Sequence, residues 1–335
     1  MPTALVTGAT GLVGSYIVDR LRADGWSVRA LIRDRSRGES LQAAGVELKA
    51  GDILDGAALA LAARGVDAIF HAAAAITPRG GWEEFRRVNI DGTKNAVAAA
   101  SSAGARLLQV SSVGVYGPSA RYDTNGAKTS ERVRLQPLPE GAFYARSKRE
   151  SETIALDAHR RGEVWAAAVR PAVVYGRRDR QFVPRVGRLL ERGFAPLIHG
   201  GRSTMAIVHA ANVADGAVRA VSSSAAGGQA YNLANDFPVS VRDFYLLAGQ
   251  GLGRRIRLVP VPMPVARTAL FVVRSVGPLV FGSRMNVITG SSSLDFITLD
   301  NPFSSERARR ELGWSPTVTP EVGVPDAFRW WAEQH

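Results

Sequence analysis

Short apolar runs alternate along this chain with longer stretches in which apolar residues recur at helical spacing. The runs at 28–32, 66–71 and 107–112 are typical of buried strands, and the apolar positions between Leu12 and Leu21 fit one face of a helix. Strands that alternate with helices form parallel sheets, because a parallel connection needs a crossover segment. The pattern therefore predicts an α/β fold with a doubly wound parallel sheet.

The remaining segments extend this alternation and then build a second region. Gly25, Gly104 and Gly313 each follow a helical stretch and are expected to end it. Further strands are expected at 46–48, 164–169, 205–208, 229–234 and 255–261, and further helices at 88–104, 143–159, 181–192, 212–222, 240–252 and 304–312. We therefore expect a sheet domain of residues 1–175 plus about 205–235, and a smaller substrate-binding region from about 176–204 and 236–335.

Three glycines spaced three residues apart stand between the first strand and the first helix. Gly8 permits a tight turn, Gly11 lets a pyrophosphate approach the bare backbone, and Gly14 lets the helix pack closely on the sheet. The phosphates then meet the N-terminus of the helix. A glycine-rich turn can join any strand to a helix, but the position directly after the first strand predicts a dinucleotide-binding site.

The end of the second strand indicates which dinucleotide is bound. A carboxylate there accepts a hydrogen bond from the 2′-hydroxyl of NAD, whereas an arginine pairs with the 2′-phosphate of NADP. Arg33 stands at this point, with Arg35 and Arg37 nearby, so NADP(H) is favoured; Asp34 leaves NAD(H) open, and a solvated loop arginine is the alternative. Asp52, after the third strand, is placed to meet the adenine amino group or to cap a turn.

Tyr144 and Lys148 lie four residues apart in a helical stretch, so their side chains share one face of the helix. A phenol with a pKa of about 10 is a poor proton donor and acceptor at neutral pH, but a neighbouring ammonium lowers that pKa. Tyr144 would then exchange a proton with a ketone or alcohol while hydride moves to or from a nicotinamide whose ribose Lys148 holds. Ser112, at the end of the fifth strand, would orient the same oxygen, and His71 is expected to be packed rather than catalytic.

Composition narrows the choice of chemistry and partners. The 335-residue chain has no cysteine, which excludes disulfides, thiol nucleophiles and cysteine-ligated zinc, and no metal site is expected. The net charge is +12, but the basic residues are nearly all arginines scattered among alanine and glycine, so we expect no nucleic-acid partner. Met1, Pro2 and Thr3 lead directly into the first strand, and a cytoplasmic location is expected.

Over essentially its whole length the chain resembles an extended short-chain dehydrogenase/reductase. The resemblance rests on residues 7–14 (TGATGLVG), Gly51-Asp52, Asn89, Ser112, Tyr116-Gly117, Tyr144 to Lys148, Arg170-Pro171 and residues 311–316 (ELGWSP). It implies catalysis by Ser112, Tyr144 and Lys148, support of the site by Asn89, and contact of residues 171–174 with the nicotinamide. It also implies a homodimer packed through the helices that carry Tyr144 and Asn89.

The glycine turn, the strand ends and this resemblance together predict the residues that contact the cofactor. They are Thr7, Gly8, Thr10, Gly11, Leu12, Val13, Gly14, Arg33, Asp52, Ile53, Ala72, Ala73, Ala74, Ser111, Tyr144, Lys148, Pro171, Ala172, Val173 and Val174.

One departure from the family pattern concerns the substrate. Sugar-nucleotide epimerases and dehydratases of this family usually carry an Arg-Asp pair where this chain has Met205 and Ala206. The pattern is more similar to the 3β-hydroxysteroid dehydrogenase-like branch, although that branch often has an aspartate where Arg33 stands. We therefore expect interconversion of a ketone and a secondary alcohol on an apolar steroid, terpenoid or β-keto acyl substrate. The alternatives are a sugar-nucleotide epimerase or dehydratase with tightly bound NAD, and an NADP-sensing module, which the Tyr144–Lys148 pair disfavours.

Residues 262–282 form the most apolar segment of the substrate-binding region. They fit a lid over a small apolar substrate, and an ordinary buried helix fits them as well. Arg267 and Arg274 interrupt the segment, so it does not reach the ~20 apolar residues that cross a bilayer. At most, we expect peripheral contact with a membrane.

Overall fold

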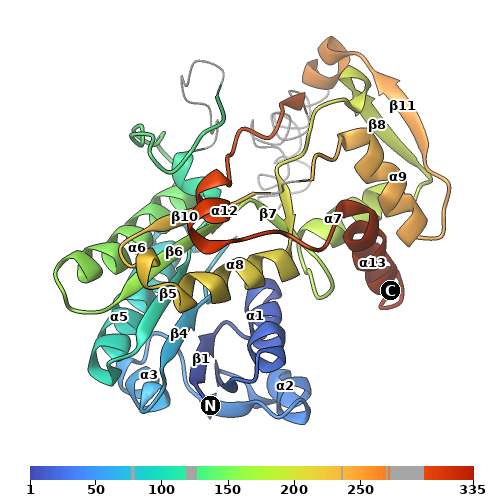
Figure 1. Ribbon diagram of the computed structural model, residues 1–335. Coiled ribbons are helices and arrows are strands. Elements are labelled where there is room, and N and C mark those ends of the chain that lie inside the picture. The colour runs from blue at the N-terminus through green and yellow to red at the C-terminus, as the bar shows by residue number, and fades with distance from the viewer. Residues whose placement is uncertain (77–79, 118–126, 235–236, 269–270, 272–297) are drawn as a thin grey trace. The chain divides into compact units, whose positions relative to one another are not determined.

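A seven-stranded parallel sheet forms the centre of the computed structural model, which describes residues 1–76, 80–117, 127–234, 237–268, 271 and 298–335 (Figure 1). The strand order is β10-β6-β5-β4-β1-β2-β3, so the chain winds outward from β1 to β3 and then reverses to β4. This confirms the predicted doubly wound sheet, in which ligands bind at the carboxyl ends of the strands beside the reversal. The strands are β1 (Thr3–Thr7), β2 (Ser27–Ile32), β3 (Glu47–Ala50), β4 (Ala68–His71), β5 (Arg106–Val110), β6 (Ala166–Pro171) and β10 (Ala230–Leu233).

Helices cover both faces of the sheet. On one face α1 packs against α8, and on the other face α5 packs against α3 and α6 (Figure 1). The helices are α1 (Leu12–Ala23), α3 (Gly56–Ala63), α5 (Gly92–Ala103), α6 (Phe143–Arg160) and α8 (Ala210–Ser222). Shorter elements join them: η1 (Arg35–Gly38), α2 (Glu39–Ala43), α4 (Gly81–Phe85), η2 (Arg86–Asp91), η3 (Val113–Tyr116), η5 (Ser224–Ala226) and α12 (Glu306–Leu312). Gly104 ends α5 in the left-handed conformation, as predicted from its position.

The core between the sheet and the α3, α5 and α6 layer becomes polar toward the carboxyl ends of the strands. Side chains two residues apart on a strand share a face. Leu5 and Ile69 are fully buried in the apolar cluster of this layer, and Thr7 and His71 follow them on the same face. Thr7 Oγ1 lies 2.8 Å from His71 Nδ1. The predicted cofactor edge is therefore lined by buried polar groups above an apolar core.

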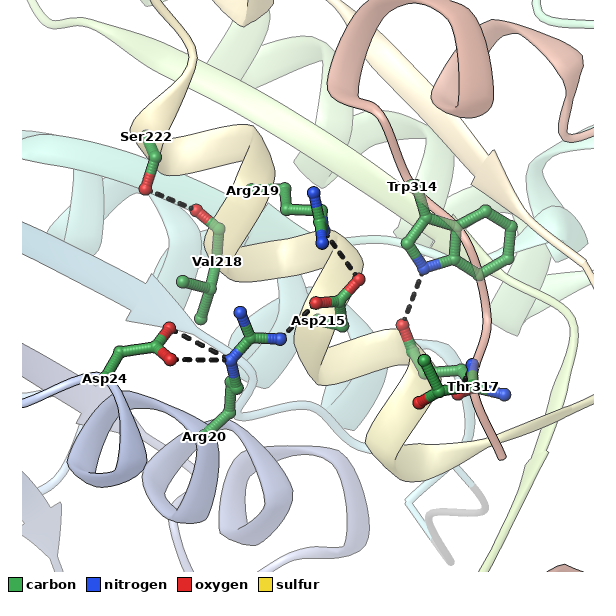
Figure 2. Close-up of polar contacts among 9 residues, drawn as sticks. Arg20, Asp24, Asp215, Val218, Arg219, Ser222, Trp314 and Thr317 are labelled. Atoms are coloured by element: carbon green, nitrogen blue, oxygen red, sulfur yellow. Dashed lines mark hydrogen bonds and ion pairs between the residues drawn. The ribbon is translucent and has the colours of Figure 1, made fainter. Parts of the chain in front are cut away.

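An ion-pair network joins α8 to α1 (Figure 2). Asp215 of α8 accepts hydrogen bonds from Arg219 Nε, over 2.8 Å, and from Arg20 of α1. Arg20 Nε also donates to both carboxylate oxygens of Asp24, over 2.9 and 3.0 Å. Because Asp215 is largely buried between two arginines, the network specifies how α8 sits on α1.

The contacts divide the chain into two compact units. The first comprises Met1–Val174, Val208–Ala234 and Phe303–Thr317, and the second comprises Tyr175–Ile207, Asn235–Pro302 and Val318–His335. We expected residues 303–317 in the substrate-binding region, but they pack into the first unit. Trp314 is buried there and its Nε1 donates to Asn212 O over 2.9 Å, while Thr317 N donates to Asn212 Oδ1 over 3.1 Å (Figure 2).

In the second unit, helices pack beside a parallel pair of strands, β8 and β11. The ring of Phe244 on α9 lies 5.6 Å from that of Phe182 on α7 and 5.9 Å from that of Phe328 on α13. The sequence pattern did not predict β8, which contains Pro196, a residue confined to sheet edges. The elements of this unit are α7 (Phe182–Leu190), β8 (Phe194–Ile198), η4 (His199–Gly201), α9 (Val241–Gly251), β11 (Arg257–Val261) and α13 (Pro320–Ala332).

The short strands β7 (Val173–Tyr175) and β9 (Ile207–His209) form a separate two-stranded sheet.

The apolar lid expected at 262–282 falls mostly outside the described residues, although 263–268 are helical. Among the residues that the structure describes, no helix has the length and apolar character needed to span a membrane.

Candidate active site

The turn between β1 and α1 has the geometry that a pyrophosphate requires. Gly8 has φ of +70°, and a Cβ there would lie 2.7 Å from Ala73 N. A Cβ on Gly14 would overlap the carbonyl of Gly8, so the helix and the turn approach as closely as glycine permits. Gly11 is the N-cap of α1 and provides no side-chain cap, and the first turn holds no acidic residue. The free N–H groups at this end of α1 therefore fit a bound phosphate.

The residues expected at the adenosine end lie close together after β2 and β3. The Arg33 side chain is 74% exposed, with Nη1 3.8 Å from Asp52 Oδ2. Asp52 Oδ1 accepts a hydrogen bond from Leu54 N over 3.0 Å, so this aspartate also stabilises its own turn. Asp34 Oδ1 accepts from Ser36 N over 3.0 Å and from Ser36 Oγ over 2.7 Å. The Arg33 guanidinium is thus more exposed than the Asp52 carboxylate beside it.

The structure brings Ser112, Tyr144 and Lys148 together from two parts of the chain. Ser112 caps η3, and its Oγ accepts from Gly114 N over 3.0 Å. The Tyr144 ring and Ser112 Oγ both lie against Gly114, and the Ser112 side chain acts to lower the pKa of the Tyr144 phenol. One turn further along α6, Lys148 is buried and its Nζ donates to Val110 O, the last residue of β5, over 2.9 Å. A hydroxyl pair and an amine thus converge where β5 ends.

The electrostatics of this group differ from the sequence prediction in one respect. We expected the Lys148 ammonium to lower the pKa of Tyr144, and this is wrong: burial raises that pKa, and the hydrogen bond with Ser112 only partly opposes the rise. The reason is geometric, because Lys148 Nζ is directed to Val110 O. Burial also lowers the pKa of Lys148 to about 8, although the negative charge of Glu152 acts to raise it. Tyr144 is therefore a neutral phenol at neutral pH, the form that donates a proton.

His71 contributes no charge to this site. Burial, reinforced by the positive charge of Lys148, lowers the pKa of His71 to about 3. Its Nε2, like the Oγ of Ser111, has no hydrogen-bond partner among the described residues. His71 is thus the packed histidine expected from the sequence. Ser111, which we expected to contact the cofactor, is likewise a buried side chain.

Asn89 lies in a π-helical turn, η2, and is fully engaged by neighbouring elements. Its Oδ1 accepts from Ala75 N over 2.7 Å, and its Nδ2 donates to Ala75 O over 3.0 Å and to Ser147 Oγ over 2.9 Å. Single π-turns inside helices are frequent at functional sites. Among the described residues, these bonds link Asn89 to the Ala72–Ala75 segment and to α6, and none reaches the Tyr144 hydroxyl or Lys148 Nζ.

The remaining predicted contacts lie along the same edge of the sheet. Ala72 N donates to Thr7 O over 3.2 Å, and Ala172 N donates to Leu233 O over 3.1 Å. Pro171 is buried at the end of β6, whereas Val173 and Val174 are partly exposed. The Ile53 carbonyl accepts from Asn95 Nδ2 over 2.8 Å. The other expected cofactor residues, Thr10, Leu12 and Val13, lie in or beside the first turn of α1.

Two groups beside the site were not identified as functional from the sequence. Ser147 precedes Lys148 and is fully buried. Arg170 donates to both carboxylate oxygens of Glu152 and, through Nη1, to Tyr116 Oη over 2.9 Å. The one available signal for Glu152 was its spacing of four residues from Lys148, which places both on one face of α6.

A glycine turn for a dinucleotide and a Ser-Tyr-Lys group at the end of β5 define an NAD(P)-dependent oxidoreductase that acts on CH–OH groups. The chain belongs to the NAD dependent epimerase/dehydratase family, which its residues 4–234 match.

Several known proteins are similar to this chain over nearly its whole length. A farnesyl-dihydroquinoline-oxide ketoreductase of Stigmatella aurantiaca is 30% identical, with 97% of this chain and 95% of the relative covered. A 3-beta-hydroxysteroid dehydrogenase of Mycolicibacterium neoaurum is 26% identical, with 98% and 91% covered. Among solved structures, a dTDP-glucose 4,6-dehydratase of Streptomyces venezuelae with bound NAD has a TM-score of 0.72 at 25% identity, with 98% and 97% covered. The expected similarity to the 3β-hydroxysteroid dehydrogenase-like branch is confirmed.

Proposed function

We propose that the protein is an NADP(H)-dependent oxidoreductase that interconverts a ketone and a secondary alcohol on an apolar substrate. The observation that carries the proposal is the grouping of Tyr144 and Ser112 around Gly114, with Lys148 one turn along the helix of Tyr144 and bonded to the end of β5. The nicotinamide, when bound, supplies or accepts the hydride. Ser112 and Tyr144 then hold the substrate oxygen, and Tyr144, a neutral phenol at neutral pH, donates the proton that completes the alcohol.

The apolar substrate is supported by the relatives. Both relatives described above act, by their names, on a farnesylated quinoline oxide or a steroid. The chain also has Met205 and Ala206 where the sugar-nucleotide enzymes usually carry charge. A sugar-nucleotide epimerase or dehydratase is the second candidate, favoured by the similarity to the NAD-bound dehydratase.

The choice of NADP over NAD rests on the strand end after β2. Arg33 is accessible to a 2′-phosphate, whereas the Asp34 carboxylate is already bonded to Ser36. A phosphate gains two parallel hydrogen bonds from a guanidinium, which favours NADP at such a position. The structural neighbour with bound NAD leaves NAD(H) as the alternative.

A panel of steroid, terpenoid and β-keto acyl ketones, each followed by NADPH oxidation, tests the proposal. Tyr144→Phe is expected to lower kcat by roughly 10²- to 10⁴-fold, the usual contribution of a positioned proton donor. Tyr245→Phe removes a buried phenol from the second unit and serves as the matched control. Full activity in Tyr144→Phe would refute the mechanism. Mass spectrometry of nucleotide released on denaturation separates the two candidates, because an epimerase retains NAD.

The family resemblance also supports a homodimer formed through α6, which carries Tyr144, and through the helical segment η2–α5, which contains Asn89. Sedimentation of the purified protein tests this proposal directly. A single species with the mass of one 35.8 kDa chain at micromolar concentration would reject it.

A further inference from the structure

Ser147 occupies a buried position between the proton donor and the lysine of the site. It is fully buried on the first turns of α6. Its Oγ donates to Tyr144 O over 2.9 Å and accepts from Asn89 Nδ2 over 2.9 Å. A serine hydroxyl has one proton, so once that proton is given to Tyr144 O, the contact with Asn89 needs the amide N–H as donor.

The Asn89 amide completes a chain of hydrogen bonds with a single consistent direction. Ala75 N donates to Oδ1, and the two protons of Nδ2 go to Ala75 O and to Ser147 Oγ. A flipped amide would place two donors against each other at Ala75 N. Thr93 Oγ1 donates to Asn89 O over 2.6 Å and supports the π-turn from the next turn of helix. The orientation of Asn89 is thus fixed by four neighbouring groups.

This chain of bonds spans the distance between the cofactor side and the proton-donor side of the site. Ala75 continues the segment Ala72–Ala74, which packs so closely on the glycine turn that a Cβ on Gly8 would lie 2.7 Å from Ala73 N. At the other end, Tyr144 O belongs to the residue whose hydroxyl meets Ser112. A shift of either end is therefore transmitted through Asn89 and Ser147.

We propose that Ser147 is a positioning residue, which with Asn89 ties the Ala72–Ala75 segment to the first turn of α6. The pair holds the wall of the dinucleotide site in register with the Tyr144 hydroxyl. This inference rests on the proposed function and assigns to Ser147 a role in both cofactor affinity and turnover. A displacement of about 1 Å in such a site lowers turnover by up to about 10²-fold.

The test compares two serines on the same helix. Ser147→Ala removes the acceptor of Asn89, whereas Ser151→Ala removes an equivalent local bond, because Ser151 Oγ donates to Lys148 O over 3.1 Å. Ser151 is also fully buried, and among the described residues no side chain from another element donates to it. The two variants therefore differ chiefly in the link to Asn89.

For each variant, nucleotide affinity is measured by quenching of tryptophan fluorescence with NADPH and NADH, together with kcat and the melting temperature. Ser147→Ala is expected to raise the Kd of the preferred nucleotide by roughly 3- to 10-fold, which corresponds to the loss of one hydrogen bond. It is also expected to lower kcat by about 10- to 100-fold. Ser151→Ala is expected to change both quantities less than twofold, at a similar melting temperature. Equal changes in Kd and kcat in the two variants would overturn the inference.

Two further variants, a second substitution of Ser147 and a double variant with Asn89, complete the test. If Ser147→Ala does not fold, Ser147→Cys keeps the size of the side chain with a weaker acceptor, and its Kd should lie above that of the native protein. Asn89→Ala combined with Ser147→Ala should raise Kd no more than the worse single variant, because both remove the same link. Additive losses would reject the link. Absence of turnover with every ketone would contradict the proposed function alone, since the Kd comparison does not require a substrate.

Discussion

Arg170 of β6 and Glu152 of α6, the helix that carries Tyr144 and Lys148, form a buried, bidentate ion pair. Arg170 Nε lies 2.9 Å from Glu152 Oε2 and Nη2 lies 2.5 Å from Oε1, and the side chains are only 8% and 6% exposed. Burial alone would lower the pKa of Arg170, but the hydrogen bond and charge of Glu152 outweigh it and raise that pKa. The pair fastens β6 to α6 one turn beyond Lys148, so it fixes the helix that carries Tyr144.

Removal of one partner from this pair is expected to destabilise the fold strongly. Arg170→Met would leave the Glu152 carboxylate buried without its counter-charge, which costs about 3–5 kcal/mol of unfolding free energy. Urea denaturation measures the loss. The exposed pair of Arg161 and Glu163 is the control, because Arg161→Ala should leave the urea midpoint nearly unchanged. An Arg170→Met midpoint equal to that of Arg161→Ala would contradict the expectation.

The pH dependence of ketone reduction should follow Lys148. Its pKa of about 8 in the folded protein means that the ammonium is lost above pH 8, while the raised pKa of Tyr144 keeps the phenol protonated there. Because the Lys148 ammonium is expected to hold the nicotinamide ribose, the rate should fall as the pH rises through about 8. Between pH 8 and pH 10.5, the ordinary pKa of a lysine, the unfolded state binds more protons at Lys148 than the folded state does. The contribution of Lys148 to the unfolding free energy therefore rises with pH in this range. The fall in rate is thus not a loss of fold.

A rate profile from pH 6 to 10, with the melting temperature recorded at each pH, checks this assignment. Glu152→Gln also breaks the buried pair with Arg170 and is expected to lower the melting temperature, but below that temperature it tests the same assignment, because the charge of Glu152 raises the pKa of Lys148. The pH above which the rate of Glu152→Gln falls should be lower than in the native protein. A profile that stays flat to pH 10 would exclude Lys148 as the titrating group.

Arg33 should control the preference between the two dinucleotides. Arg33→Asp replaces an exposed guanidinium with a carboxylate, which repels the 2′-phosphate and accepts from the 2′-hydroxyl. The ratio of kcat/KM for NADPH to that for NADH is expected to fall by roughly 10- to 100-fold, which corresponds to the loss of about two charge-assisted hydrogen bonds. Asp34→Ala is the paired control, since its carboxylate is bonded to Ser36. An unchanged ratio in Arg33→Asp would remove the phosphate-binding role.

Gly114 should be intolerant of even a methyl group. A Cβ at this position would lie 3.2 Å from Tyr144 Cε1 and 3.3 Å from Ser112 Oγ. Gly114→Ala is therefore expected to displace the two hydroxyls and to lower kcat by about 10-fold or more, with a small change in melting temperature. Gly56→Ala adds the same methyl on α3, where the nearest atom is Asn95 Oδ1 at 3.4 Å, and should leave kcat unchanged. Equal kcat values in the two variants would argue against a close fit around Tyr144.

Much of the fold and part of the site were predictable because they depend on short stretches of sequence. The strand and helix periods, the Gly8 turn and the left-handed end of α5 at Gly104 are each set within a few residues. The spacing of Tyr144 and Lys148 likewise places them on one helical face without reference to the rest of the chain. Local hydrogen bonding and side-chain direction suffice for these features.

Only the tertiary structure decided which distant groups meet. The bond between Asn89 and Ser147 joins residues 58 positions apart, and Trp314 reaches Asn212 over 102 positions. Such contacts depend on the strand order and on how each helix sits on the sheet, which no local period encodes. The raised pKa of Tyr144 has the same origin, because burial is a property of the packed molecule. The sequence by itself determined the elements and the reacting groups, and the packing determined their contacts and their charge.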